Sequence, residues 1–169
     1  MDYKKLMDMT GKVCIVTGGT GYLGTENVKI LKDFGATVVV ADIRAAEERW
    51  ANAPQPVGDL FVECDVSASE SIRACFQKVY DTYGHIDVLI NNAGIADYDL
   101  INVITPARWR RLFAVNVDGA FYCIRAALPH MLRQQSGCIL NVSSMWGQVG
   151  ASCEAAYSAT KGAILALTK

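Results

Sequence analysis

Several features that would place a protein in a specialised class are missing from this sequence. Among its 169 residues, 16 basic side chains stand against 17 acidic ones, the net charge is −1, and no long basic run occurs. Nucleic acids and anionic membrane surfaces attract clustered positive charge, so neither is expected as a partner. The longest apolar runs, such as residues 38–41, are strand-sized and far too short to span a membrane.

Cysteines are present but scattered. None of the six belongs to a C-x-x-C pair or stands at ligand spacing from a histidine, so no metal site and no disulfide framework are expected. Cys14, Cys64 and Cys138 lie in apolar strand-like runs, where a thiol acts as a small hydrophobic side chain. The first ten residues lack the apolar core of a secretory signal. We therefore expect a cytoplasmic protein in a reducing compartment.

Strand and helix patterns alternate along the chain. Short apolar, β-branched runs predict strands, and segments with helical spacing follow them. The expected strands are 12–17, 37–42, 60–64, 86–91 and 138–143, and the expected helices are 22–34, 44–51, 69–83, 106–134 and 155–169. Repeated βα units predict a parallel sheet with helices on both faces. The expected fold is a doubly wound α/β sheet of the Rossmann type, within one domain over residues 1–169.

A glycine-rich turn, TGGTGYLG at residues 17–24, separates the first expected strand from the first helix. Backbone N–H groups at a helix N-terminus can bind a pyrophosphate if no Cβ blocks the approach. Gly18, Gly21 and Gly24 would supply the tight turn, the close approach and the close helix packing. A purely structural turn is the alternative, but the place of these glycines in a βαβ unit favours a dinucleotide site.

Asp42 ends the second expected strand, where a carboxylate can accept hydrogen bonds from the adenosine ribose. Its charge would repel a 2′-phosphate, and the glycine turn has no Lys or Arg to offset it, so NAD(H) is favoured over NADP(H). Arg44 leaves NADP(H) open, because it could neutralise a phosphate or stack on adenine. Alternatively, Asp42 is a strand-end acid that only begins a turn.

A phenol and an ammonium stand four residues apart at Tyr157 and Lys161, hence on one face of a helix. Oxidation of an alcohol needs a base for the hydroxyl proton, and a free tyrosine with a pKa of about 10 is too weakly ionised at neutral pH. The ammonium, together with a positively charged nicotinamide, would lower that pKa. Ser144 ends the fifth expected strand, where its hydroxyl could hold the substrate oxygen.

These motifs, taken in order, resemble those of the short-chain dehydrogenase/reductase family. The family's marks are a TG-plus-glycines turn, N-N-A-G, a catalytic Asn, a catalytic Ser and Y-x-x-x-K. The chain has them at 17–24, 91–94, Asn116, Ser144 and Tyr157 with Lys161. The resemblance implies hydride transfer between NAD(H) and a secondary alcohol or ketone. Two kinds of member are most similar, namely 3-oxoacyl-acyl-carrier-protein reductases and NAD-linked sugar or polyol dehydrogenases.

The resemblance also implies a role for each matching residue. Tyr157 would be the acid/base, Ser144 would orient the substrate oxygen and the phenol, and Lys161 would bind the nicotinamide ribose and lower the tyrosine pKa. Asn116 would anchor a proton-relay water. The cofactor-binding residues would be Gly18, Thr20, Gly21, Tyr22, Leu23, Gly24, Asp42, Asp65, Val66, Asn92, Ala93, Gly94, Tyr157 and Lys161, with Asp65 and Val66 at the adenine. For Asn92 and Ser143, strand-end capping is favoured over catalysis.

Two features depart from the family pattern. Tyr22 occupies the usual position of the second glycine, which here is Gly21, so a locally rearranged turn is expected. Family members are longer and add two strands and a substrate loop, so we expect the chain to be incomplete at its C-terminal end. The alternative to an enzyme is a non-catalytic remnant that binds dinucleotide or pairs with other subunits. The resemblance further implies homodimers or homotetramers built through the helices near 107–134 and after 155.

Overall fold

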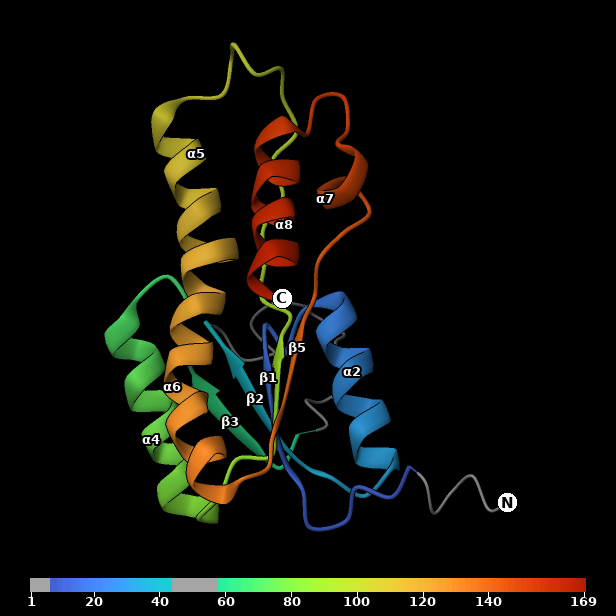
Figure 1. Cartoon of the computed structure of the whole chain (residues 1–169), viewed down its shortest axis with the longest axis vertical. Helices are drawn as coiled ribbons and strands as arrows, with labels where there is room; N and C mark the ends of the chain where they lie inside the picture. Colours follow the sequence, from blue (N-terminus) through green and yellow to red (C-terminus); the bar gives the residue numbers. More distant parts are fainter. Residues whose placement is uncertain (1–6, 44–57) are drawn as a thin grey trace.

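The computed structural model describes residues 7–43 and 58–169. Five parallel strands form one sheet in the order β3-β2-β1-β4-β5, so β1 is central and the chain winds outward on both sides of it (Figure 1). The strands are β1 (Val13–Thr17), β2 (Thr37–Asp42), β3 (Leu60–Glu63), β4 (Val88–Asn91) and β5 (Cys138–Asn141). The prediction of a doubly wound parallel sheet is confirmed.

Helices cover both faces of this sheet and extend beyond its carboxyl edge. Val28 and Leu31 of α2 (Tyr22–Asp33) pack on one face, and α4 (Ser69–Tyr83) and α6 (Gly119–Gln134) pack on the other. Beyond the strand ends, α5 (Pro106–Phe113) stands beside α8 (Ala155–Leu167) (Figure 1). A short helix, α7 (Trp146–Val149), packs on α8 and was not anticipated from the sequence.

Burial on both faces explains why the strand sequences are continuously apolar. Along β1, Val13 and Ile15 face the cluster under α4 and α6, whereas Cys14 and Val16 face the cluster under α2. All four are at most 3% exposed. A parallel sheet with helices on both sides has no polar face, so its strands show no alternation.

The long helix predicted over residues 106–134 is interrupted. It begins as predicted, with the Thr105 hydroxyl accepting a hydrogen bond from the Arg108 N–H and Pro106 in the first turn. A π-helical segment, η1 (Ala114–Asp118), then separates α5 from α6. The prediction of one continuous α-helix is wrong at this point, and π segments of this kind are often found at functional sites.

Two strands are two residues shorter than predicted: β4 begins at Val88 and not at residue 86, and β5 ends at Asn141 and not at residue 143. The predicted helix over 44–51 and the side chain of Arg44 lie outside the described residues. In the part of the chain that the structure describes, no helix is long and apolar enough to cross a membrane.

Candidate active site

Parallel strands bring their carboxyl ends to one edge of the sheet, and the segments that follow them line a cleft of about 340 Å³. The size suits a small-molecule site. The cleft brings together these predicted cofactor-binding residues: Gly18, Gly21, Tyr22, Leu23, Gly24, Asp42, Asp65, Val66, Asn92, Ala93 and Gly94. Thr20 is buried beneath this surface and does not line it.

The glycine turn is built as a close-fitting cradle. Gly18 has a φ of +63°, and a Cβ added to it would lie 2.8 Å from Ala93 Cα. A Cβ on Gly24 would lie 2.1 Å from the Gly18 carbonyl oxygen, so only glycine allows α2 to begin this close to β1. The Gly21 N–H donates to the Gly18 carbonyl at 3.0 Å and ends the turn. Tyr22 then opens the helix with its side chain 81% exposed, which explains why a tyrosine is tolerated there.

The N-terminus of α2 fits an anion. Gly21, the N-cap residue, makes no side-chain cap, and the first turn has no acidic residue. Within the described ranges, the N–H groups of Tyr22, Leu23 and Gly24 have no hydrogen-bond acceptor. Unpaired N–H groups at a helix N-terminus bind phosphate groups through hydrogen bonds and the helix dipole. These residues therefore fit the pyrophosphate of a dinucleotide.

Asp42 fastens the glycine turn to the end of β2. Its Oδ2 accepts hydrogen bonds from the Thr20 N–H at 3.1 Å and from the Thr20 hydroxyl at 2.7 Å. Its Oδ1 accepts from the Ile43 N–H at 2.8 Å, and the side chain is 4% exposed. Thr20 thus acts on the cleft through Asp42, whose carboxylate is part of the cleft lining.

Asp65 and Val66 line the cleft after β3. Asp65 is exposed, and its Oδ1 accepts hydrogen bonds from the Ser67 N–H at 2.9 Å and the Ser67 hydroxyl at 2.7 Å. Val66 is buried against Gly119 at the start of α6, where a Cβ would lie 3.0 Å from the Val66 carbonyl oxygen. The pair presents one acidic and one apolar side chain beside each other.

The segment after β4 is tied to the glycine turn. The Asn92 Nδ2 donates to the carbonyl oxygens of Thr17 at 3.0 Å and Gly18 at 3.1 Å. In return, the Thr17 hydroxyl accepts from the backbone N–H groups of Asn92 and Ala93, both at 3.1 Å. These hydrogen bonds give Asn92 the strand-end role that was predicted for it. The sequence analysis assigned no role to Thr17, whose hydroxyl completes the connection.

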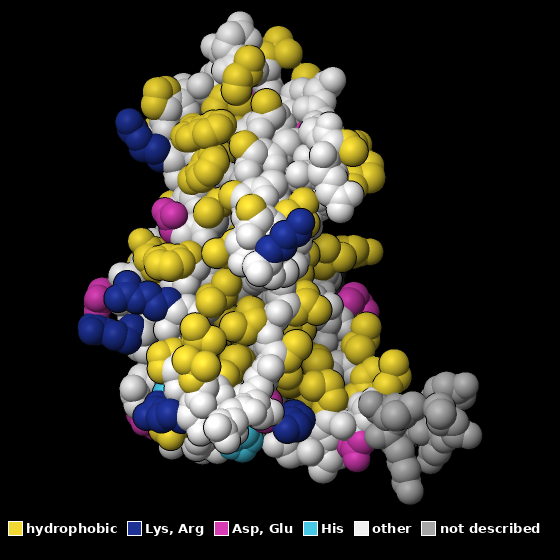
Figure 2. Space-filling view, in the orientation of Figure 1, with side chains coloured by type: hydrophobic (Ala, Val, Ile, Leu, Met, Phe, Trp, Pro, Cys, Tyr) yellow, Lys and Arg dark blue, Asp and Glu magenta, His cyan; other side chains and the backbone are white. Residues whose placement is uncertain are grey.

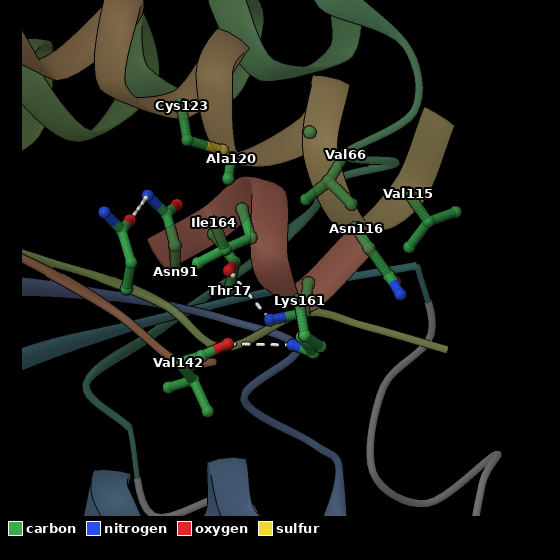
Figure 3. A pocket seen from close by; sticks show the side chains of 13 residues that line it. Thr17, Val66, Asn91, Val115, Asn116, Ala120, Cys123, Val142, Lys161 and Ile164 are labelled. Carbon is green, nitrogen blue, oxygen red and sulfur yellow. Dashed lines mark hydrogen bonds between the residues drawn. The ribbon is translucent and has the colours of Figure 1, made fainter. Parts of the chain in front are cut away.

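Ser144, Tyr157 and Lys161 meet beyond the end of β5. The Ser144 hydroxyl lies beside the Tyr157 phenol and accepts a hydrogen bond from the Trp146 N–H at 3.2 Å. The Lys161 ammonium lies 5.7 Å from the centre of the Tyr157 ring. It donates to the Val142 carbonyl at 2.8 Å (Figure 3). Ser143 donates to the Lys161 carbonyl at 2.8 Å, so it caps backbone as predicted.

Burial dominates the electrostatics of this group. It raises the pKa of the Tyr157 phenol, the Ser144 hydroxyl partly opposes the rise, and the charges of Glu154 and Tyr98 add to it. Burial also lowers the pKa of Lys161. The lowering of the Tyr157 pKa by Lys161 together with a positively charged nicotinamide stays a prediction.

Asn116 lies in the π segment and is 2% exposed. Its Oδ1 accepts from the Ile95 N–H at 2.8 Å, and its Nδ2 donates to the Ile95 carbonyl at 2.9 Å and the Thr160 hydroxyl at 3.0 Å. A Cβ on Gly94 would lie 3.4 Å from Asn116 Oδ1 and 3.6 Å from Lys161 Nζ. Asn116 therefore holds the segment after β4 against α8, and its link to a relay water stays a prediction.

A small cavity of about 10 Å³ lies between the strand ends and the helices that carry Asn116 and Lys161 (Figure 3). This is about the smallest space that can hold one water molecule. Asn91 lines it and donates through Nδ2 to Asn141 Oδ1 at 2.8 Å, while its buried Oδ1 has no hydrogen-bond partner in the described chain. The cavity separates the core under α6 from the Lys161 ammonium.

The chain is similar in sequence and in structure to known dehydrogenases and reductases. The model of the short chain dehydrogenase family matches residues 12–169. The chain is 34% identical over 161 residues to a cis-4-hydroxycyclohexanecarboxylate dehydrogenase of Sinomonas cyclohexanicum, covering 94% of the chain and 65% of that protein. It is 33% identical over 170 residues to the 3-oxoacyl-[acyl-carrier-protein] reductase of Chlamydia pneumoniae, covering 96% and 68%. The crystal structure of an NAD⁺-bound xylitol dehydrogenase matches with a TM-score of 0.88 and 32% identity, covering 95% of the chain and 63% of the neighbour.

Proposed function

The chain belongs to the short-chain dehydrogenase family, and from this premise we propose that it transfers a hydride between NAD(H) and a secondary alcohol or ketone. The observation that carries the proposal is the meeting of Ser144, Tyr157 and Lys161 beside a cleft whose glycine turn fits a pyrophosphate. In this proposal residues 1–169 act as one dinucleotide-binding domain, and the chain spans between 58% and 68% of the length of the curated relatives it matches.

When bound, the nicotinamide would accept or supply the hydride. Tyr157 would take or give the hydroxyl proton at its phenol oxygen, and Ser144, which lies beside that phenol, would hold the substrate oxygen. The Lys161 ammonium has three donors, so it can keep the Val142 carbonyl and still donate to ribose hydroxyls. Because burial raises the Tyr157 pKa, the phenol is protonated at neutral pH and suited to protonating a ketone oxygen. Oxidation of an alcohol needs a nearby positive charge to stabilise phenolate.

Asp42 supports a preference for NAD(H). Its carboxylate is fixed at the end of β2, and it lines the cleft where a ribose would lie beside the glycine turn. A 2′-phosphate there would bring two negative charges together. Two substrate classes are consistent with the relatives, namely a 3-oxoacyl thioester and a sugar or polyol, since one relative is a 3-oxoacyl reductase and a structural neighbour is a xylitol dehydrogenase.

Assembly into homodimers or homotetramers is part of the proposal. Hydrophobic side chains gather along α6 and α8 and over β5 on the face that carries the C-terminus (Figure 2). On α6, Phe121 is 46% exposed, Leu128 42% and Leu132 67%. Exposed apolar side chains that gather on one face are typical of a protein–protein interface. Leu112, which lies within the predicted interface region near 107–134, is 1% exposed and belongs to the core. A cytoplasmic, reducing location is proposed alongside, and Cys14, Cys64, Cys75 and Cys123 are buried as free thiols.

Titration of the 169-residue chain with NADH and NADPH, followed by NAD⁺ with secondary alcohols, tests the proposal. The alcohols are polyols, cyclic alcohols and 3-hydroxyacyl thioesters. We expect NADH to bind at least tenfold more tightly than NADPH and one alcohol class to reduce NAD⁺. Binding without turnover on any class would favour the non-catalytic dinucleotide-binding alternative. Absence of binding by either dinucleotide would overturn the proposal.

A further inference from the structure

The lining of the cofactor cleft includes one basic side chain among its described residues. Asp42 and Asp65 contribute carboxylates, and Arg111 of α5 contributes a guanidinium. A dinucleotide adds the negative charge of its pyrophosphate. The N–H groups at the start of α2 carry no full charge, so Arg111 is the group of this lining that can pair with an anion.

Arg111 differs from the other two arginines of α5. Arg108 forms ion pairs with Asp97 and Asp99, donating from Nε to Asp97 at 2.8 Å and from Nη1 to Asp99 at 2.9 Å. Arg110 is exposed and does not line the cleft. Arg111 lines the cleft, and its side chain makes no hydrogen bond or ion pair with any other residue of the described ranges.

Helix geometry places Arg111 over the same space as the predicted site residues. It lies one turn before Val115, hence on the same helix face, and Val115 lines the cleft as well. We propose that Arg111 is the cation that binds the phosphate charge of the dinucleotide, a role that rests on the proposed function. A guanidinium presents a planar fork of donors that can bind a phosphate through two hydrogen bonds. Because Asp42 disfavours a 2′-phosphate, the pyrophosphate is the expected partner.

The test compares Arg111→Ala with Arg110→Ala, a neighbouring arginine on the same helix that points away from the cleft. Calorimetric titration of each variant with NADH, ADP-ribose, NADPH and adenosine separates the possible contacts. We expect Arg111→Ala to weaken NADH and ADP-ribose about tenfold, the effect of one partly exposed charge-assisted hydrogen bond. Arg110→Ala should stay within about twofold, and the difference should shrink at high ionic strength. Arg111→Lys, which keeps the charge, should recover part of the affinity.

Each outcome decides the assignment. A loss on NADPH alone would keep Arg111 as a phosphate cation and move its contact to the 2′-phosphate. Equal losses for adenosine and NADH would overturn the proposal, since they would indicate stacking on adenine. Equal affinities for the two alanine variants would overturn it as well. If wild type binds no dinucleotide, the proposed function itself fails, and that result is distinct from an unaltered Arg111→Ala.

Discussion

Removing the hydroxyl of Thr17 should destabilise the protein far more than its size suggests. Thr17 is 1% exposed, its hydroxyl accepts from the Asn92 and Ala93 N–H groups, and it donates to the Ile90 carbonyl at 3.3 Å. Valine has nearly the same shape but no acceptor, so Thr17→Val leaves the Ala93 N–H unpaired, whereas the Asn92 N–H keeps the Ile90 carbonyl at 3.0 Å as its acceptor. Each unpaired buried donor costs about 1–3 kcal/mol.

Ala93 is half-buried, so the lower end of that range applies to its donor. We expect Thr17→Val to lower the free energy of unfolding by about 1–2 kcal/mol. Urea unfolding followed by circular dichroism measures the loss as a shift in midpoint at constant slope. Thr82→Val is the matched control, because the exposed Thr82 hydroxyl donates only to the Lys78 carbonyl and its loss should cost less than about 0.5 kcal/mol. A loss of under about 0.5 kcal/mol for Thr17→Val would refute the role given to its hydroxyl.

Three further outcomes are expected. Gly24→Ala should abolish measurable NADH binding in calorimetry while the chain stays folded by circular dichroism, because its Cβ would lie 2.1 Å from the Gly18 carbonyl oxygen; unchanged binding would show that the turn is not the pyrophosphate site. Since its pKa is raised, Tyr157 keeps its proton in the folded chain above about pH 10, where an unfolded tyrosine loses it. Stability should therefore fall as pH rises past about 10, and by less in Tyr157→Phe; parallel unfolding curves for the two proteins would contradict the shift. Asp42→Ala should narrow the difference in affinity between NADH and NADPH, and a difference that persists would assign the preference to another group.

Local patterns were sufficient for the sheet and for the glycine turn. Strands buried on both faces need continuous apolar residues, and β1 and β2 have them. The turn requires residues without a Cβ at places that the sequence alone identifies, since Gly18 and Gly24 would collide with backbone if substituted. Both features were predicted correctly, because the residues that specify them stand next to each other in the sequence.

Features that depend on distant backbone were not predictable in the same way. The π segment places Asn116 against Ile95 and Thr160, which lie 21 and 44 residues away in the chain. The Lys161 ammonium is held by the Val142 carbonyl, and a backbone acceptor leaves no trace in side-chain patterns. Three arginines in α5 look alike in sequence, and only the positions of Asp97 and Asp99 distinguish Arg108 from the others.

The measurement that tests the central claim most directly is NAD⁺ reduction by the substrate identified in the alcohol panel, compared between wild type, Tyr157→Phe and Tyr83→Phe. Tyr83 ends α4, remote from the cleft, and controls for the loss of a phenol hydroxyl. We expect Tyr157→Phe to bind NADH as wild type does and to keep less than about a hundredth of its rate, with Tyr83→Phe unchanged. A Tyr157→Phe rate above about a hundredth of wild type would contradict the assignment of Tyr157 as the group that moves the proton.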